Sequence, residues 1–277
     1  MCRKGIKILS KYDFQPFRSD CLVRRGQSNG DGGYLIPCTI RAELLISFGL
    51  GDNWKFENDL VKSGHVYDFI VFDHSQNLFN YIKQVFLTIK LRNFRLNLLM
   101  GRVIVLLRYF RDFKILRKKH VKKRISKNGS LFNRKTKINE INEINVTEIF
   151  QEFVKSENVK VFLKIDIEGS EYEIIEQIMN HSNQIRLIVI EFHDIHKRVE
   201  EFEKLFNLLK SKYSLIHTHI NNNGAFDKNM IPEVCEFTFI NSLDFNGILR
   251  VDKIPLRELD QPNNKNLRDF QIDFTKI

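Results

Sequence analysis

Residues 44–51 read LLISFGLG, a mostly apolar run that ends on two glycines separated by one residue. A second run of this kind, VYDFIVF at 66–72, ends on Asp73, and helical periodicity fills the sequence between the two. Buried strands that alternate with helices are typical of β–α–β units, so this stretch predicts a mostly parallel sheet.

The same alternation continues along the chain. The fold class that it indicates is α/β, a doubly wound Rossmann-like sheet. The expected strands are Leu44–Phe48, Val66–Phe72, a weaker one near Val121–Ser126, Val159–Ile167, Ile185–Phe192, Ser214–Ile220 and Val234–Ile240. The expected helices are Trp54–Ser63, two from Asn77 to about His120, Ile149–Val154, Glu171–Met179 and His196–Lys212.

Two helix starts carry a capping-box pattern, in which a side chain at the N-cap and an acid three residues later satisfy each other's backbone amides. Asn145 with Glu148 is one, and Ser170 with Glu173 is the other. We expect both boxes to form.

We expect one domain over residues 1–277, with a lead-in at 1–42, a basic helical insertion at 77–120 and an irregular tail at 243–277. The four cysteines include no C-x-x-C pair, so reduced thiols in a cytoplasmic protein are expected. The longest apolar stretch, 96–110, contains two arginines, and no transmembrane segment is predicted.

The net charge of +10 is concentrated in one segment. Residues 79–127 contain 15 Lys or Arg and one acid, which gives +14 and leaves about −4 for the rest of the chain. Such a segment is either a solvated helix face or, through residues 86–124, a surface for anionic membranes. Because the basicity is local and no RNA-binding motif accompanies it, a nucleic-acid partner is not favoured.

The residues after the first two strands suggest a nucleotide-like cofactor. Gly49, Leu50 and Gly51 would let a ligand approach the backbone, and Asp73 would accept hydrogen bonds from ribose hydroxyls. The third glycine of the dinucleotide fingerprint is absent, which argues against NAD. The alternatives are an ordinary strand–helix turn and a solvated acid or N-cap.

Further polar residues end the later strands. Lys164, Asp166 and Glu168 alternate with isoleucines, and a central strand holds charges only if they are paired or functional. A Lys164–Asp166 pair, or Glu168 at a helix start, is the structural alternative. Glu191, His193, His217 and His219 follow. Asp166, Glu191 and His193 have the donor types of a metal site, but no spacing demands one, and no metal ligand is assigned.

Residues 164–171, KIDIEGSE, resemble the K-x-D-x-E-G-x-E hallmark of FkbM-type methyltransferases. Other segments resemble one bacterial branch of that family, and together they cover the chain from about Arg24 to Phe274. They are NGDGGY at 29–34, SFGLGD at 47–52 with Phe56 and Glu57, FDH at 72–74, EFH at 191–193, HTHINN at 217–222 and LDQPN at 259–263. The basic stretch around 92–124 matches no family motif.

The resemblance implies a class I methyltransferase sheet whose last strand is antiparallel, with S-adenosyl-L-methionine as cofactor. By position, Gly49, Leu50 and Gly51 would pass along the cofactor, Asp73 with the adjacent His74 would hold its ribose, and Asp166 would face its methionine part. Family members commonly methylate hydroxyl oxygens of sugars and other metabolites, so a small-molecule or glycan acceptor is expected.

For the reaction we expect His193 and His219 as candidate bases and Glu168 as the residue that orients the acceptor. Two competing functions remain: an RNA methyltransferase that uses the basic segment, and an inactive membrane-associated adapter on the same fold. The expected location is the cytoplasm, or the inner face of the membrane.

Overall fold

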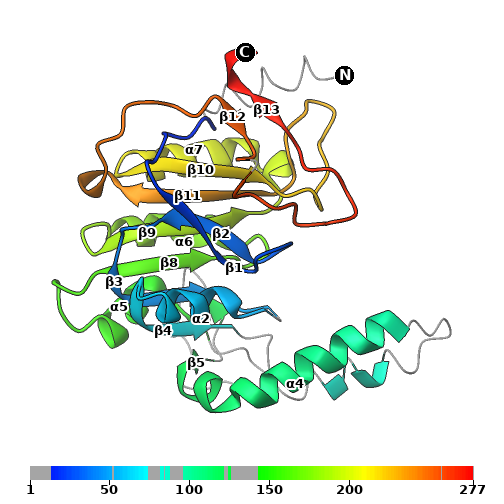
Figure 1. Cartoon of the computed structure of the whole chain (residues 1–277). Coiled ribbons are helices and arrows are strands. Elements are labelled where there is room, and N and C mark those ends of the chain that lie inside the picture. Colours follow the sequence, from blue (N-terminus) through cyan, green and yellow to red (C-terminus); the bar gives the residue numbers. More distant parts are fainter. Residues whose placement is uncertain are drawn as a thin grey trace.

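The computed structural model describes residues 14–51, 53–73, 82–83, 85–87, 96–121, 124–125, 143–256 and 258–276. Its centre is a seven-stranded sheet with the order β10-β11-β9-β8-β3-β4-β5 (Figure 1). The strands are β3 (Ala42–Phe48), β4 (Val66–Phe72), β5 (His120–Val121), β8 (Val161–Ile165), β9 (Ile185–Phe192), β10 (Tyr213–Ile220) and β11 (Cys235–Asn241).

The sheet is mostly parallel. β3 pairs in parallel with both β4 and β8, β4 with β5, and β8 with β9, whereas β11 lies antiparallel between β9 and β10. The predicted α/β class with an antiparallel last strand is therefore confirmed. Parallel neighbours bring their carboxyl ends to one edge, which is where ligands bind in such sheets.

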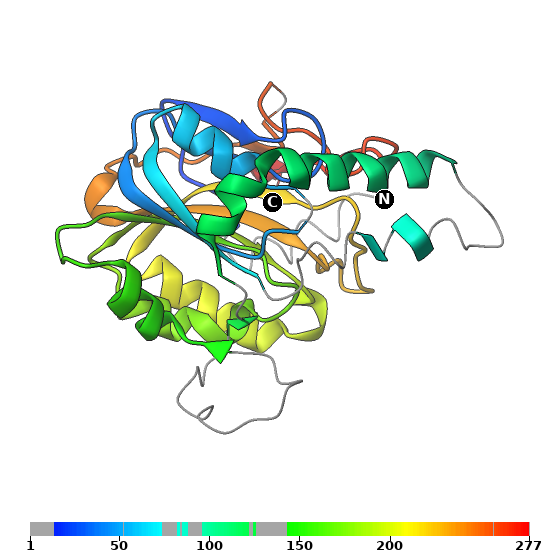
Figure 2. The ribbon, with the colours of Figure 1, turned by 90° about the horizontal axis from the view of Figure 1, so that it is seen from below.

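Each face of the sheet has its own apolar core (Figures 1 and 2). Helices α5 (Val146–Phe153), α6 (Glu171–Met179) and α7 (Val199–Lys210) cover one face. Helix α2 (Lys55–Lys62) and a hairpin of β1 (Leu22–Gly26) and β2 (Gly33–Pro37) cover the other. Covering both faces explains why the central strands are apolar on both sides.

The remaining elements are short. They are η2 (Ile195–Lys197), η3 (Ser242–Asp244), η4 (Phe274–Lys276), and the two-residue strands β6 (Arg124–Ile125), β7 (Glu143–Ile144), β12 (Lys253–Ile254) and β13 (Ile272–Asp273). β6 pairs with β7, and β12 pairs with β13.

One predicted capping box forms and the other does not. Asn145 accepts a hydrogen bond from the Glu148 amide at 2.8 Å, and Glu148 accepts one from the Asn145 amide at 2.9 Å. Helix α6 begins at Glu171 as expected, yet Ser170 makes no side-chain cap bond. Instead the carboxylate of Glu171 accepts the amides of Ile167 and Gly169, so the predicted Ser170 box is wrong.

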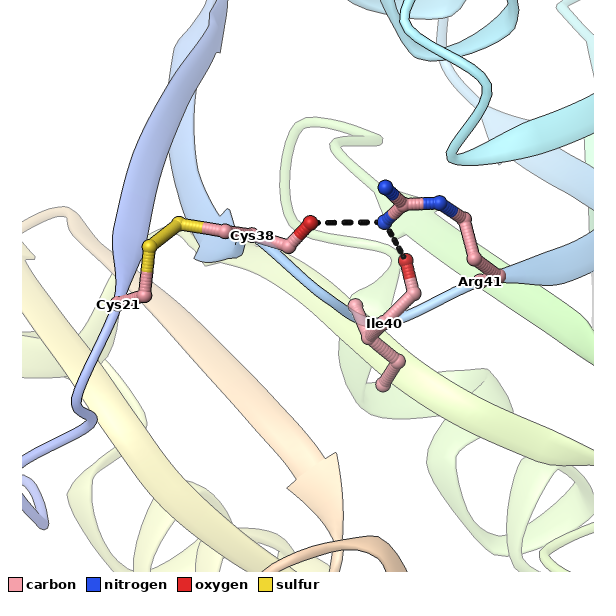
Figure 3. Close-up of a disulfide and its surroundings, with 4 residues drawn as sticks. All are labelled: Cys21, Cys38, Ile40 and Arg41. Atoms are coloured by element: carbon pink, nitrogen blue, oxygen red, sulfur yellow. Dashed lines mark hydrogen bonds between the residues drawn. A yellow bond between two sulfur atoms is a disulfide. The ribbon is translucent and has the colours of Figure 1, made fainter.

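The expectation of four reduced cysteines is wrong for two of them. Cys21 and Cys38 form a disulfide with Cα atoms 5.5 Å apart (Figure 3). They are the next positions in the β1–β2 register, which pairs Leu22 with Pro37, so the bond closes the open end of the hairpin. Arg41 donates to the carbonyls of Cys38 and Ile40 beside it.

The basic segment contributes helix α4 (Leu96–Lys119), which extends beyond the sheet near β5 (Figures 1 and 2). The other helix expected between Asn77 and His120 falls largely outside the described residues. Among the described residues, no helix is long and apolar enough to cross a membrane. A membrane-binding role for residues 86–124 stays a prediction.

Candidate functional site

The glycine turn after β3 is in contact with the residue that follows β8. Gly49 has a φ of +82°, and a Cβ there would lie 1.7 Å from the carbonyl oxygen of Asp166. Gly51 has a φ of +58°, and a Cβ there would meet nothing within 4 Å. The first glycine lets two strand ends approach each other, and the second permits the left-handed backbone conformation of the turn.

Asp73, directly after β4, lies against this turn. Its Oδ2 accepts the amide of Leu50 at 2.8 Å and that of Gly51 at 3.3 Å, and the residue is 7% exposed. The structure therefore brings together the residues that the sequence proposed for the cofactor. His74, the last of that set, lies outside the described residues.

Lys164 links β8 to the glycine turn through a hydrogen bond. Its ammonium donates to the carbonyl of Gly49 at 2.8 Å and lies 3.5 Å from Asp166 and 3.9 Å from Glu57. Burial opposes the charged form, but these two carboxylates outweigh it and raise the pKa of Lys164. The Lys164–Asp166 pair considered as the structural alternative does exist.

Asp166, Glu191 and His193 meet at the carboxyl ends of β8 and β9. One ligand atom from each lies within 4.8 Å of the other two. The hydroxyl of Tyr34 donates to Asp166 at 3.4 Å. Burial, followed by the charges of Asp166 and Glu236, raises the pKa of Glu191 well above its usual range. The carboxyl group of Glu191 therefore keeps its proton to a higher pH than an exposed glutamate does.

His193 is held by Glu171 and by Glu168. Its Nδ1 lies 2.9 Å from Glu171 Oε1, and its Nε2 lies 3.5 Å from Glu168 Oε2. Burial opposes the charged ring, yet the hydrogen bond and charge of Glu171 outweigh it and raise the pKa of His193 to about 10. Glu168 itself follows the end of β8, with a φ of 54° and a side chain 86% exposed.

His219 is enclosed between two carboxylates. Its Nε2 lies 3.0 Å from Asp269 and its Nδ1 lies 3.4 Å from Glu236. Burial opposes the charged ring, but these contacts raise the pKa of His219 to about 10. Its neighbour His217 pairs with Asp260 at 3.0 Å. These contacts tie β10 to the C-terminal segment, so both histidines have structural partners.

Three further residues join the site from distant parts of the chain. Asp31 lies in the turn of the β1–β2 hairpin, Glu236 near the start of β11, and Asn263 in the C-terminal segment. The amide of Asn263 donates to Asp31 at 3.0 Å and to Glu236 at 2.6 Å. Asp31 and Asn263 belong to segments that resemble the family, but sequence reasoning gave them no role.

The arrangement suits an adenosyl cofactor with a positively charged sulfonium. Asp73 places a carboxylate at the glycine turn, and Asp166 places another beside Gly49. Carboxylates are the usual partners of ribose hydroxyls and of cations.

Comparison with solved structures finds distant likenesses. A Streptococcus pneumoniae protein assigned as a tRNA (m1A22) methyltransferase has a TM-score of 0.34 and 8% identity, over 73% of this chain and 65% of that chain. TrmK of M. capricolum has 0.31 and 9%, over 81% and 71%. Scores this low carry no argument about substrate. No curated protein sequence matches the chain.

The family comparison is decisive. Residues 62–216, more than half of the chain, match the model described as the methyltransferase FkbM domain. This range includes β4 with Asp73, β8 with Asp166, and β9 with Glu191 and His193. The chain belongs to the FkbM methyltransferase family, and its cofactor is S-adenosylmethionine.

Proposed function

We propose that this chain methylates a hydroxyl oxygen of a saccharide or related metabolite. The observation that carries the proposal is the contact between the glycine turn and Asp166, since a Cβ at Gly49 would overlap the Asp166 carbonyl. Asp166 is thereby shared by the proposed cofactor end of the site and by its group with Glu191 and His193. The methyl donor and the acceptor hydroxyl would therefore lie next to each other beside Asp166.

When bound, S-adenosylmethionine supplies an activated methyl group that passes from sulfur to the acceptor oxygen as the hydroxyl loses its proton. The protein mainly has to position the two partners, and positioning can contribute roughly 7–11 kcal/mol. Gly49, Leu50, Gly51 and Asp73 would hold the cofactor. Asp166 would favour the positive charge near the sulfur.

The acceptor end favours a hydroxyl-rich molecule over RNA. Carboxylates and amides from the β1–β2 turn, from β9, from the residue after β10, from β11 and from the C-terminal segment gather there: Asp31, Glu191, Asn221, Glu236 and Asn263. Such groups accept and donate hydrogen bonds to sugar hydroxyls. A cluster of negative charge repels phosphates, which speaks against the RNA methyltransferase alternative.

Removal of the acceptor proton is the demanding step. His193 lies with Asp166 and Glu191, whereas His219 is enclosed by Asp269 and Glu236, so we favour His193 as the base. Glu168, beside His193, would orient the acceptor. Since His193 stays protonated below a pKa of about 10, it must first release its own proton.

Cofactor binding tests the proposed function. We expect saturable binding of S-adenosylmethionine by calorimetry and at least tenfold weaker binding by Asp73→Asn, which removes a charge but keeps the shape. Asp68→Asn, at an exposed position of the same strand, should bind like wild type. Folded wild-type protein that does not bind the cofactor would refute the methyltransferase assignment and favour the inactive adapter.

A further inference from the structure

Two overlapping groups of metal-type side chains share Glu191. Asp166, Glu191 and His193 form one, and Asp31, Glu191 and Glu236 form the other; within each, one ligand atom per residue lies within 4.8 Å of the rest. Ligand atoms about 2.0–2.3 Å from an ion lie within about 4.6 Å of one another. Small side-chain movements would therefore suffice to bind one.

His193 is oriented as metal-binding histidines are. The side chain of Glu171 is fully buried, and its Oε1 already accepts the amides of Ile167 and Gly169. The same oxygen lies 2.9 Å from Nδ1 of His193, so Nε2 is the nitrogen that an ion would contact, in place of the exposed Glu168 carboxylate that now lies 3.5 Å from it. A carboxylate behind a histidine fixes the ring and strengthens it as a ligand.

The buried carboxylate of Glu191 receives few hydrogen bonds. It is 5% exposed, and within the described residues it receives one hydrogen bond, from Asn221 to Oε1 at 2.7 Å. The carboxylates nearest to it carry the same charge, those of Asp166 and Glu236. The positive group that faces Glu191 is His193, the third member of the same cluster.

The nearby cations that the structure describes are already shared. Lys164 serves both Asp166 and Glu57, and His219 serves both Asp269 and Glu236. Glu191 faces the ring of His193, which is itself a member of the cluster. A divalent ion would bring more positive charge to these carboxylates than that single ring does.

We propose that Asp166, Glu191 and His193 bind one divalent cation at the acceptor end of the site. Two carboxylates and an imidazole suit Mn²⁺ or a similar first-row ion better than Ca²⁺, which prefers oxygen ligands. The inference rests on the proposed function: the ion would bind the acceptor hydroxyl and ease loss of its proton to water. His193 would then be a ligand, and no free base would be required.

The test is calorimetric titration of chelator-treated protein with MnCl₂, with the bound ion followed by the loss of the free Mn²⁺ signal in electron paramagnetic resonance. We expect one saturable site, weakened at least tenfold by Glu191→Gln. Asp166→Asn provides a second ligand variant if Glu191→Gln does not fold. Glu171→Gln, behind His193, should weaken binding about 10- to 100-fold.

A matched control comes from Asp194, His196 and Glu233, a partly exposed group of metal-type residues. Glu233→Gln should bind Mn²⁺ like wild type. The proposal is overturned if wild-type protein shows no saturable Mn²⁺ binding, or if Glu233→Gln rather than the ligand variants abolishes it. S-adenosylmethionine binding, measured on the same samples, distinguishes failure of the metal site from failure of the proposed function. Cofactor binding without Mn²⁺ binding would refute the metal site alone.

Discussion

Single residues explain why the contact between the glycine turn and Asp73 was predictable from sequence and the cluster around Glu191 was not. Gly49, Gly51 and Asp73 act at the ends of their own strands, so their order along the chain predicts their place. Glu236 gave no such signal, because its partners Glu191 and His219 lie on other strands. Sequence also suggested His193 and His219 as bases without revealing the carboxylates that hold their protons.

His65, at the start of β4, should make the fold sensitive to acid. Burial, with the charges of Arg41 and Arg25, lowers its pKa to about 4. The unfolded chain binds this proton near pH 6.5. Stability is therefore complete above pH 6.5 and is lost as pH falls toward 4, by up to about 1.4 kcal/mol per pH unit.

Urea unfolding of wild type and His65→Asn at pH 7 and pH 5 measures this contribution. Asparagine can keep the contact that Nδ1 makes with Ser63 at 2.8 Å but does not titrate. The variant should lose less stability than wild type between the two pH values. Equal losses would show that other groups cause the acid sensitivity.

At the level of helices and strands, apolar runs predicted the sheet well because β8, β9 and β11 are almost wholly buried. The bounds of β4 and β9 agree with the prediction to the residue. The predicted strand 159–167 is too long, since β8 ends at Ile165 and leaves Asp166 and Glu168 beyond it. Charged residues that alternate with isoleucines give the same pattern inside a strand and just after it. The sequence alone therefore could not show that the strand ends at Ile165.

The two capping-box patterns make a direct comparison of helix starts. Asn145→Ala removes a bond that exists and should lower the free energy of unfolding by about 1 kcal/mol, in the 0.5–2 kcal/mol range of such caps. Ser170→Ala removes no side-chain cap bond and should change it by less than about 0.5 kcal/mol. Chemical denaturation of both variants checks this, and equal losses would contradict the structure.

Across the whole molecule, the site depends on contacts between opposite ends of the chain. Asn263 bonds to Asp31 across a separation of 232 residues, and Thr238 bonds to Leu35 across 203. Propensity and periodicity act over a few residues and carry no information about such pairs. The hairpin and its disulfide went unpredicted for the same reason.

The disulfide should stabilise the hairpin that carries Asp31. Cys21 and Cys38 are 17 residues apart, and closing a loop of that size contributes about 3 kcal/mol in the chain-entropy model. Without reductant, Cys21→Ser should unfold at lower urea concentration than wild type, and with reductant the two should converge. Titration of all four thiols in denatured, unreduced wild type would show that the bond does not form.

The reversed direction of β11 has a consequence for synthesis on the ribosome. Because this strand runs opposite to its neighbours, its first residues, Cys235 and Glu236, lie beside the last residues of β9. A nascent chain that ends at Ile220 would already contain six of the seven central strands, yet it would lack Glu236 and Asn263. The contacts around Glu236 are therefore completed only after Asn263 has left the exit tunnel.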